Sequence, residues 1–462
     1  MKTQTLYLTI AFALFISFIA EGKEPTEVLR HSVPEKWSYA SEFNQILPTE
    51  DNWWKTFNDD CLDSLIVLAV NNNPDLSIAT KRITLAKSAV RMAESGYYPM
   101  LSASAGWDRS RSTGRASNTA TLGVDFSWEI DIFGKVTSQA NAKKALWQAS
   151  KSDYDAIMVS LCANVATYYI NLRTWQNQYE VALSHINSQK MVLEMTEARY
   201  NSGLASMLDV SQAKTMYLST VSTLLPLEAN IETQINNLAY LIGIYKSQLP
   251  ASITKPISLP NAEQFIPVGV PMDLLRRRPD VKEAEYTLAS YAEEIGVAKK
   301  DFLPTLSLDG QIGFKSNKFS DLFDKNSFTY TIAPTLSWTI FNGLERKYQL
   351  IEAKEQYMIG VENYNGAVTN AVNEVDNALI TYKYMLQDVK ELQQVTDEAY
   401  NALQLSIDLY KRGLSSFTNV LTSQQTYLQY NNELVNSKGK SLLALISIYH
   451  ALGGGWDNQQ SK

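Results

Sequence analysis

Four short segments of the chain alternate between apolar and polar residues. They are 101–110, 120–132, 305–315 and 328–340. A period of two predicts strands that have one apolar face. Each segment holds about ten residues, the length at which a tilted strand crosses a lipid bilayer. An ordinary sheet that packs on a protein core would show the same alternation, so the pattern alone leaves both interpretations open.

Two much longer segments, about 135–200 and 344–410, carry an apolar residue at every third or fourth position. A helix of about 65 residues would be roughly 100 Å long. Shorter segments of the same period follow each one, at about 217–242 and 417–452. The spacing favours coiled-coil packing and predicts two long helical hairpins, the first kinked at Pro226. A coiled-coil spacer without a transport role would have the same pattern.

The chain also repeats itself at a spacing of 205 to 210 residues. Tyr200, Gly203, Leu204, Ser206 and Gly243 find matches in Tyr410, Gly413, Leu414, Ser416 and Gly453. Each repeat opens with a helix at a Pro-Asp pair, because proline and an acidic residue both suit a first helical turn. We therefore predict two structural repeats, 60–243 and 272–453, whose hairpins are 135–242 and 344–452.

Four segments lie outside the repeats. Lys2 and the apolar stretch after it predict a signal peptide over 1–22. An N-terminal arm follows over 23–59, and a tail occupies 454–462. The linker 244–271 contains five prolines, which exclude a continuous helix.

Composition excludes several functions. The 41 basic and 48 acidic residues give a net charge of −7, which argues against a nucleic-acid partner. The 3 histidines are far apart, and no cysteine or acidic cluster accompanies them. We therefore predict no metal, no cofactor and no catalytic residue. The run Arg276-Arg277-Arg278 is expected to be surface charge ahead of a helix.

The 2 cysteines, Cys61 and Cys162, leave a disulfide possible. A buried free thiol is the preferred interpretation for Cys162, because this residue flanks an apolar helical seam. No cysteine lies near the signal cleavage site, so a lipid anchor there would have no acceptor.

The turns after the two long helices are similar, Tyr200–Ser206 and Tyr410–Ser416. A glycine after a helix can adopt the left-handed conformation at little cost, as we expect of Gly203 and Gly413. Ser206 and Ser416 are placed to cap the next helix. The chain therefore has two equivalent hairpin tips.

Geometry restricts how four strands could serve a membrane. A sheet within lipid must close on itself, and small membrane barrels need at least about eight strands. A single chain is thus insufficient, whereas a dimer would supply eight strands, a trimer twelve and a tetramer sixteen.

Several motifs resemble the TolC superfamily of outer-membrane efflux proteins, in its drug-efflux lipoprotein branch (NodT/OprM-like). They are Leu274–Val281, Ile295–Lys299, Phe302–Pro304, Trp128–Gly134 and Leu452–Trp456. The resemblance covers about residues 35–457. It implies a mostly helical chain whose tandem-duplicated hairpins form an α-barrel, with four strands contributed to the twelve-stranded β-barrel of a homotrimer.

The resemblance also implies function and partners. The channel would be the exit duct of a tripartite efflux pump in the outer membrane of a Gram-negative bacterium, with a periplasmic extension and a belt of accessory segments. Its tips would bind a periplasmic adaptor that is coupled to an inner-membrane transporter. The residues that match the adaptor-facing tips are Gly203, Leu204, Ser206, Gly413, Leu414 and Ser416.

The aperture is where the chain departs from the family. Tyr410 matches the expected aperture residue, but Asn419 and Thr422 occupy positions where family members often have acids. Asp209 is the remaining acid at the first tip, and it is equally suited to a plain helix start. Many members of the branch also carry a lipidated cysteine, which this sequence lacks.

Two other functions remain open. A duct for type I protein secretion would use the same architecture. A soluble periplasmic coiled-coil adaptor is a different class, but it predicts one hairpin and no lipid-facing strands.

Overall fold

The structure is a computed structural model. It describes residues 34, 37, 52–112, 114–260 and 277–454. The predicted signal peptide, most of the N-terminal arm, part of the linker and nearly all of the tail therefore lie outside the described residues.

The chain forms two compact units, and each contains parts of both sequence repeats. The first unit includes 81–152 and 280–367, and the second includes 33–80, 153–279 and 368–462. Helices α4 (Lys135–Asn201) and α9 (Glu345–Lys411) have 67 residues each and contribute to both units.

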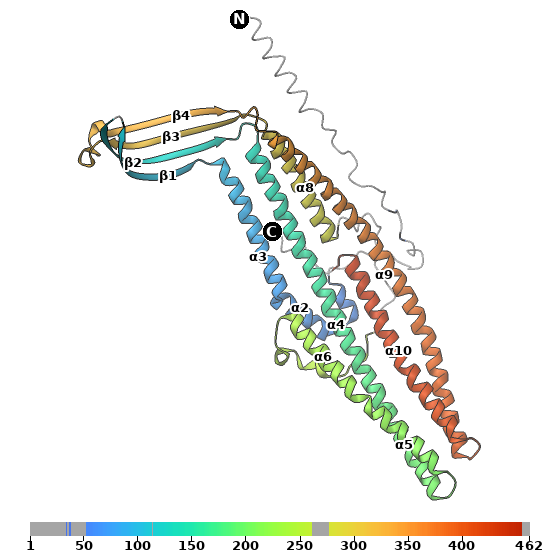
Figure 1. Cartoon of the computed structure of the whole chain (residues 1–462). Helices are drawn as coiled ribbons and strands as arrows, with labels where there is room; N and C mark the ends of the chain where they lie inside the picture. Colours follow the sequence, from blue (N-terminus) through green and yellow to red (C-terminus); the bar gives the residue numbers. More distant parts are fainter. Residues whose placement is uncertain (1–33, 35–36, 38–51, 113, 261–276, 455–462) are drawn as a thin grey trace. The chain divides into compact units, whose positions relative to one another are not determined.

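A four-stranded antiparallel sheet forms much of the first unit (Figure 1). Its strands follow chain order: β1 (Met100–Ser112), β2 (Arg115–Ile130), β3 (Thr305–Ser316) and β4 (Phe328–Ser337). β2 and β3 join the two repeats, with Asp125 opposite Gln311. β4 ends three residues before the predicted 340. In the described part of the chain, β1 and β4 each pair along one edge only.

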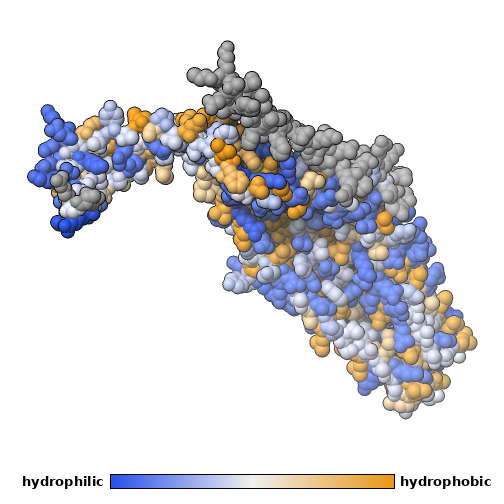
Figure 2. All heavy atoms as spheres, turned by 45° about the horizontal axis from the view of Figure 1, so that its top comes forward, coloured by the Kyte–Doolittle hydropathy of each residue, from blue (hydrophilic) through white to orange (hydrophobic). Residues whose placement is uncertain are grey.

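The two faces of the sheet differ as the alternation predicts. One face carries large apolar side chains that are largely exposed, including Tyr330 at 71%, Ile332 at 65% and Leu336 at 69%. An ordinary core sheet would bury this face, so these side chains contradict that alternative. The end of the sheet that carries the connecting turns is hydrophilic (Figure 2).

The opposite face of the sheet is polar and holds two carboxylates in place. Asp125 accepts hydrogen bonds from Ser104 Oγ at 2.8 Å and Gln311 Nε2 at 2.7 Å. Asp309 accepts from Ser127 Oγ at 2.6 Å and Ser307 Oγ at 2.9 Å. All of these donors lie on the same face, which therefore carries two hydrogen-bonded clusters, one around each carboxylate.

The helices of the first unit pack through charged contacts near the sheet. α8 (Pro279–Lys300) begins at its Pro-Asp pair, as does α3 (Pro74–Glu94), which contributes to both units. Lys300 Nζ donates to the Gly134 carbonyl at 2.9 Å and to Ser138 Oγ at 2.7 Å. These bonds tie the end of α8 to the start of α4.

The second unit contains α2 (Asp60–Asn72), α5 (Met207–Ser222), α6 (Leu224–Ile242) and α10 (Phe417–Ala451). The sequence analysis did not identify α2 as a separate helix. The returning helix of the first hairpin breaks at Thr223, between α5 and α6. Pro226 is the third residue of α6, and its missing N–H accounts for a break there rather than a bend at the proline itself.

Short segments pack on one side of α4 and α10; we call them the belt segments (52–59 and 250–257). The indole of Trp53 stacks on Tyr449 at 4.9 Å, and the Tyr169 hydroxyl donates to Asp59 at 2.5 Å. The buried Arg173 donates to the Lys255 carbonyl at 2.6 Å and packs on the Tyr169 ring. The hydrogen bonds of this buried cation fix the segment 250–257 to α4.

Both cysteines are buried and neither forms a disulfide bond, which confirms the preferred interpretation of Cys162 as a buried thiol. Burial raises the pKa of the Cys162 thiol to about 12, so this thiol is unreactive. Within the described ranges, none of the helices combines the length and apolar character of a membrane span.

Candidate functional site

The hairpin tips are built as the repeat predicts. Gly203 has φ = +73° and Gly413 has φ = +75°, so both occupy the left-handed region. Their N–H groups donate to the carbonyls of Tyr200 at 2.9 Å and Tyr410 at 3.0 Å, which closes the ends of α4 and α9. The leucines that follow, Leu204 and Leu414, are 67% and 72% exposed. Each tip therefore presents an apolar side chain to its surroundings.

The two tips are capped differently. Ser206 Oγ accepts from the Asp209 N–H at 3.2 Å, while Asp209 Oδ2 accepts from the Ser206 N–H at 3.0 Å. This is a complete capping box. Ser416 occupies the matching position but its side chain makes no cap bond, so the prediction of a second serine cap is wrong. Asn419 stands where the first repeat has Asp209, and its amide donates instead to Ser415 Oγ at 2.9 Å.

Four helices share one small core near the tips, which we call the tip core. It consists of Val192 on α4, Ala213 on α5, Tyr410 on α9, and Phe417 and Val420 on α10. The Tyr410 and Phe417 rings meet edge to face at 5.5 Å. The two hairpins are thus joined by apolar packing.

Arg199 is a tip residue that sequence reasoning missed. Its guanidinium carbon lies 4.7 Å from the centre of the Tyr410 ring, and Nη1 donates to the Lys411 carbonyl at 3.0 Å. A side chain of the first hairpin therefore contacts the end of α9 in the second hairpin through both a ring contact and a hydrogen bond. The repeat contained a signal, because Arg199 corresponds to Leu409 and breaks the symmetry of the two tips.

The proposed aperture residues have different environments. Tyr410 is buried and its ring is enclosed by Arg199 and Phe417, whereas Asn419 and Thr422 are exposed. Asp209 is engaged in the capping box. The structure thus brings Tyr410 together with Arg199. It places Asp209 at the start of a helix, and Asn419 and Thr422 on the surface.

Polar side chains are buried between α4 and α10, farther along these helices from the hairpin tips than the tip core. His185 contacts the Tyr427 ring at 4.7 Å, and its Nε2 lies 3.2 Å from Asn431 Nδ2. Burial lowers the pKa of His185 to about 4. Both amide atoms of Gln189 and the Nε2 of Gln424 are buried without a hydrogen-bond partner in the described part of the chain. The interface between α4 and α10 therefore leaves more buried polar atoms without hydrogen bonds than an ordinary helix interface does.

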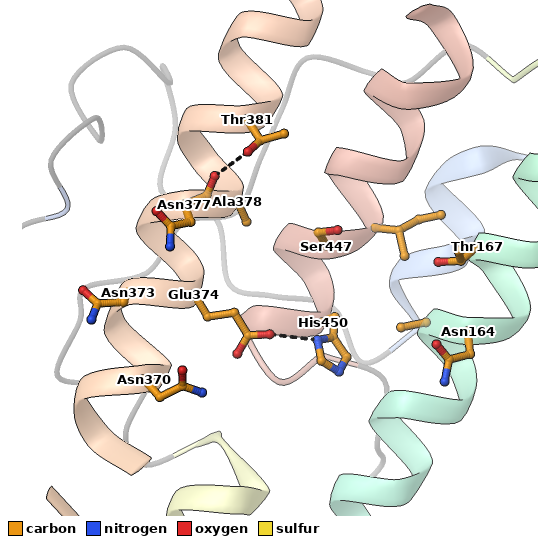
Figure 3. Close-up of a pocket in the computed structure, with 12 residues that line it drawn as sticks. Asn164, Thr167, Asn370, Asn373, Glu374, Asn377, Ala378, Thr381, Ser447 and His450 are labelled. Carbon is orange, nitrogen blue, oxygen red and sulfur yellow. Dashed lines mark hydrogen bonds and ion pairs between the residues drawn. The ribbon is translucent and has the colours of Figure 1, made fainter. Parts of the chain in front are cut away.

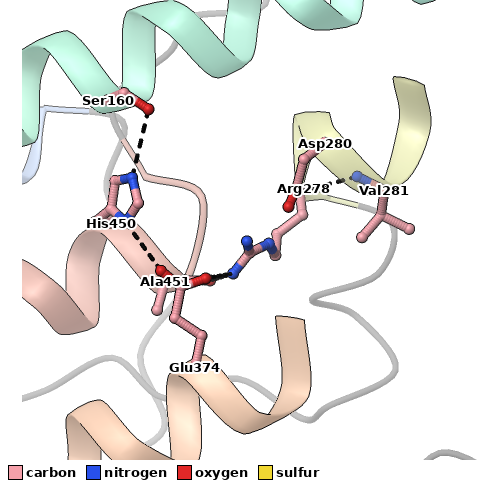
Figure 4. Close-up of polar contacts among 7 residues, drawn as sticks. All are labelled: Ser160, Arg278, Asp280, Val281, Glu374, His450 and Ala451. Carbon is pink, nitrogen blue, oxygen red and sulfur yellow. Dashed lines mark hydrogen bonds and ion pairs between the residues drawn. The ribbon is translucent and has the colours of Figure 1, made fainter. Parts of the chain in front are cut away.

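Arg278 corrects the expectation of surface charge. It is buried, and Nη1 donates to Glu374 Oε2 at 2.7 Å and to the Ala451 carbonyl at 2.9 Å (Figure 4). Glu374 Oε1 lies 3.2 Å from His450 Nδ1. The hydrogen bonds from His450 and Arg278 lower the pKa of Glu374 to about 2. Local sequence could not reveal this pairing, because Glu374 lies 96 residues from Arg278.

With this geometry established, comparison with known proteins identifies the family. The profile described as "Outer membrane efflux protein" matches residues 65–244 and 270–454, the two repeats. The chain belongs to the outer membrane efflux protein family. A similar curated protein is the probable efflux pump outer membrane protein TtgC of Pseudomonas putida, 28% identical over 98% of this chain and 96% of the relative.

Other family members support the assignment. Nodulation protein T of Rhizobium leguminosarum is 26% identical over 98% of both chains. The solved outer-membrane channel OprN superposes with a TM-score of 0.88 at 27% identity, covering 94% of this chain and 99% of that one. The fold is accordingly that of the TolC-like efflux channels, with long helical hairpins and four membrane strands per chain. The protein is an outer-membrane efflux channel.

Proposed function

We propose that three copies of the chain form the exit duct of a tripartite pump and passively conduct small molecules such as drugs to the exterior. The observation that carries the proposal is the sheet of the first unit. It exposes an apolar face, and β1 and β4 pair along one edge only in the described part of the chain. Unpaired backbone groups are not tolerated in hydrocarbon, so the edges need partners from other copies.

Three copies of four strands give twelve, enough for a membrane barrel. The polar face then lines the lumen, where Asp125 and Asp309 meet water. The apolar face, with Tyr330, Ile332 and Leu336, meets lipid. A duct of this kind needs no catalytic group, and transport through it would be driven by the pump.

The hairpin tips are proposed as the docking surface for a periplasmic adaptor. Leu204 and Leu414 are exposed apolar side chains in equivalent positions, each next to a glycine in the left-handed conformation. Met207 and Leu208 extend the first tip, at 57% and 65% exposure. Exposed apolar residues on a hydrogen-bonded turn suit a protein partner that covers them. Gly203, Ser206, Gly413 and Ser416 shape this surface.

The same tips are proposed to restrict the aperture. Arg199 and Tyr410 hold the second hairpin against the first. The amide of Gln189 and the Nε2 of Gln424, which have no hydrogen-bond partner among the described residues, reduce the stability of the closed packing. Loss of the Arg199 contacts would therefore favour an open tip.

Purification and reconstitution test the function. We expect a heat-resistant trimer in the outer-membrane fraction, ion conductance in planar bilayers, and drug accumulation in cells that lack the gene. A soluble monomer without conductance would refute the duct. A trimer whose deletion abolishes protein export and leaves drug accumulation unchanged would instead indicate type I secretion.

A further inference from the structure

The second unit contains a cavity of about 510 Å³ among α4, α9 and α10 (Figure 3). Most of the residues that line it carry amide or hydroxyl groups, and they come from all three helices. They include Asn164, Asn370, Asn373, Asn377, Thr381 and Ser447. The four on α9 recur at intervals of three or four residues, so they form one continuous polar row along that helix.

On α4 and α10, the cavity lies on the side opposite the belt segments. Ser447 lines the cavity while Tyr449, two positions later, stacks on Trp53 of the belt. On α4, Asn164 lines the cavity while Tyr169 bonds to Asp59 of the belt. Positions two or five apart on a helix point roughly 140–200° apart around its axis. If the belt covers the outside of a closed wall, the cavity opens to the water inside it.

The cavity offers hydrogen bonds but little net charge. Its one acid, Glu374, is ionised and compensated by the buried Arg278, with His450 on its other oxygen. By contrast, the side chains of Asn370 and Asn373 make no hydrogen bond to the described residues. A primary amide has two donors and a carbonyl acceptor, so it can bind either kind of polar group.

We propose that this cavity is a contact site for cargo, and that it accommodates uncharged, drug-sized molecules bearing hydroxyl and amide groups. The inference rests on the proposed duct function and adds a place and a chemical class to it. Its volume falls within the range of small-molecule sites. A site with little net charge suits a duct, because a conducted molecule must bind weakly enough to leave.

The test uses the full-length protein in planar bilayers, with chloramphenicol as a neutral probe that carries an amide and hydroxyls. Each contact should interrupt the ion current briefly. The triple variant N370A/N373A/N377A should shorten the interruptions by about fivefold or more, because each amide contributes a modest hydrogen-bond energy. Its conductance without the probe should match that of the unmodified protein.

Two further variants make the test specific. Asn401→Ala removes an exposed asparagine on the same helix that does not line the cavity, and it should leave the interruptions unchanged. The triple variant to glutamine keeps the amides and should retain most of the effect. Interruptions that are absent in the unmodified protein, equally long in the alanine triple, or equally shortened by Asn401→Ala would each overturn the proposal. A reconstituted protein without any conductance would instead refute the duct itself.

Discussion

The guanidinium of Arg199 lies on the ring of Tyr410, with 4.7 Å between the guanidinium carbon and the ring centre. The same side chain donates a hydrogen bond to the Lys411 carbonyl. In addition to the tip core, this one residue therefore connects the ends of two hairpins from different repeats. Its position makes it the most informative residue to change at the tips.

Arg199→Leu should favour the open tip, because it removes the cation–π contact and the hydrogen bond and keeps an apolar stem. The loss is about 2 kcal/mol, or roughly thirtyfold in the ratio of open to closed states. Single-channel recordings should reveal longer or larger openings. Arg412→Leu removes the same charge from an exposed neighbour and should leave the recordings unchanged. Identical recordings for both variants would contradict the role of Arg199.

The two serines of the tips should respond differently to alanine. Ser206→Ala breaks the capping box and should cost about 1 kcal/mol locally, which corresponds to roughly fivefold faster hydrogen exchange of the Asp209 amide. Ser416→Ala should have almost no effect on the Asn419 amide, since that side chain makes no cap bond. Mass-spectrometric exchange measures both. Equal acceleration at the two tips would show that the serines are equivalent after all.

Acid should weaken the packing between α4 and α10. The pKa of His185 is about 4 in the folded chain and about 6.5 when unfolded, so the unfolded state binds the proton first as the pH falls. Its contribution to stability is complete above about pH 6.5 and is lost progressively down to about pH 4. In the His185→Gln variant, the melting temperature should depend less on pH over this interval. Parallel curves for the two proteins would exclude His185 as the cause.

The carboxylates on the polar face of the sheet should give the channel a preference for cations. The double variant D125N/D309N removes six charges from a trimer and should lower the cation-to-anion permeability ratio by about twofold or more. Reversal potentials across a salt gradient measure this ratio. Asp324→Asn, in the β3–β4 connection, removes a charge outside the strands and serves as the control. A larger effect of the control than of the double variant would place selectivity elsewhere.

Adjacent residues of β4 allow a direct test of which face meets lipid. Ile332→Arg puts a charge on the exposed apolar face and should cost about 2–4 kcal/mol of insertion free energy. Thr331→Arg adds the same side chain to the polar face and should be tolerated. The yield of heat-resistant trimer in outer membranes distinguishes them. Comparable yields would mean that this face does not contact hydrocarbon.

Much of the fold was predictable because it depends on periodicity. Alternation over 120–132 and 305–315 identified β2 and β3, and the three-to-four spacing identified α4 and α9. The sequence could not give the pairing of Asp125 with Gln311, since register depends on neighbours 186 residues away. Alternation also could not decide between lipid and a protein core, a choice that depends on the exposure of Ile332.

The site was predicted less completely, for a related reason. Gly203 and Gly413 were recognisable because a left-handed turn restricts the residue type locally. Arg199 and Arg278 have no local signature, because each acts on a partner brought close by the tertiary fold. For Ser416 the prediction was wrong for the opposite reason. The repeat suggested a helix cap by analogy with Ser206, but the Ser416 side chain forms no cap bond.

The outer edges of β1 and β4, which have no strand partner among the residues that the structure describes, also have a consequence for biogenesis. Exposed strand edges are templates for pairing with any extended chain, so a newly exported copy is vulnerable to aggregation until its neighbours arrive. Completion of the barrel is therefore a reaction between molecules, and its speed depends on how many are present together. A cell that produces little of this channel would need a chaperone to keep single copies competent while they wait.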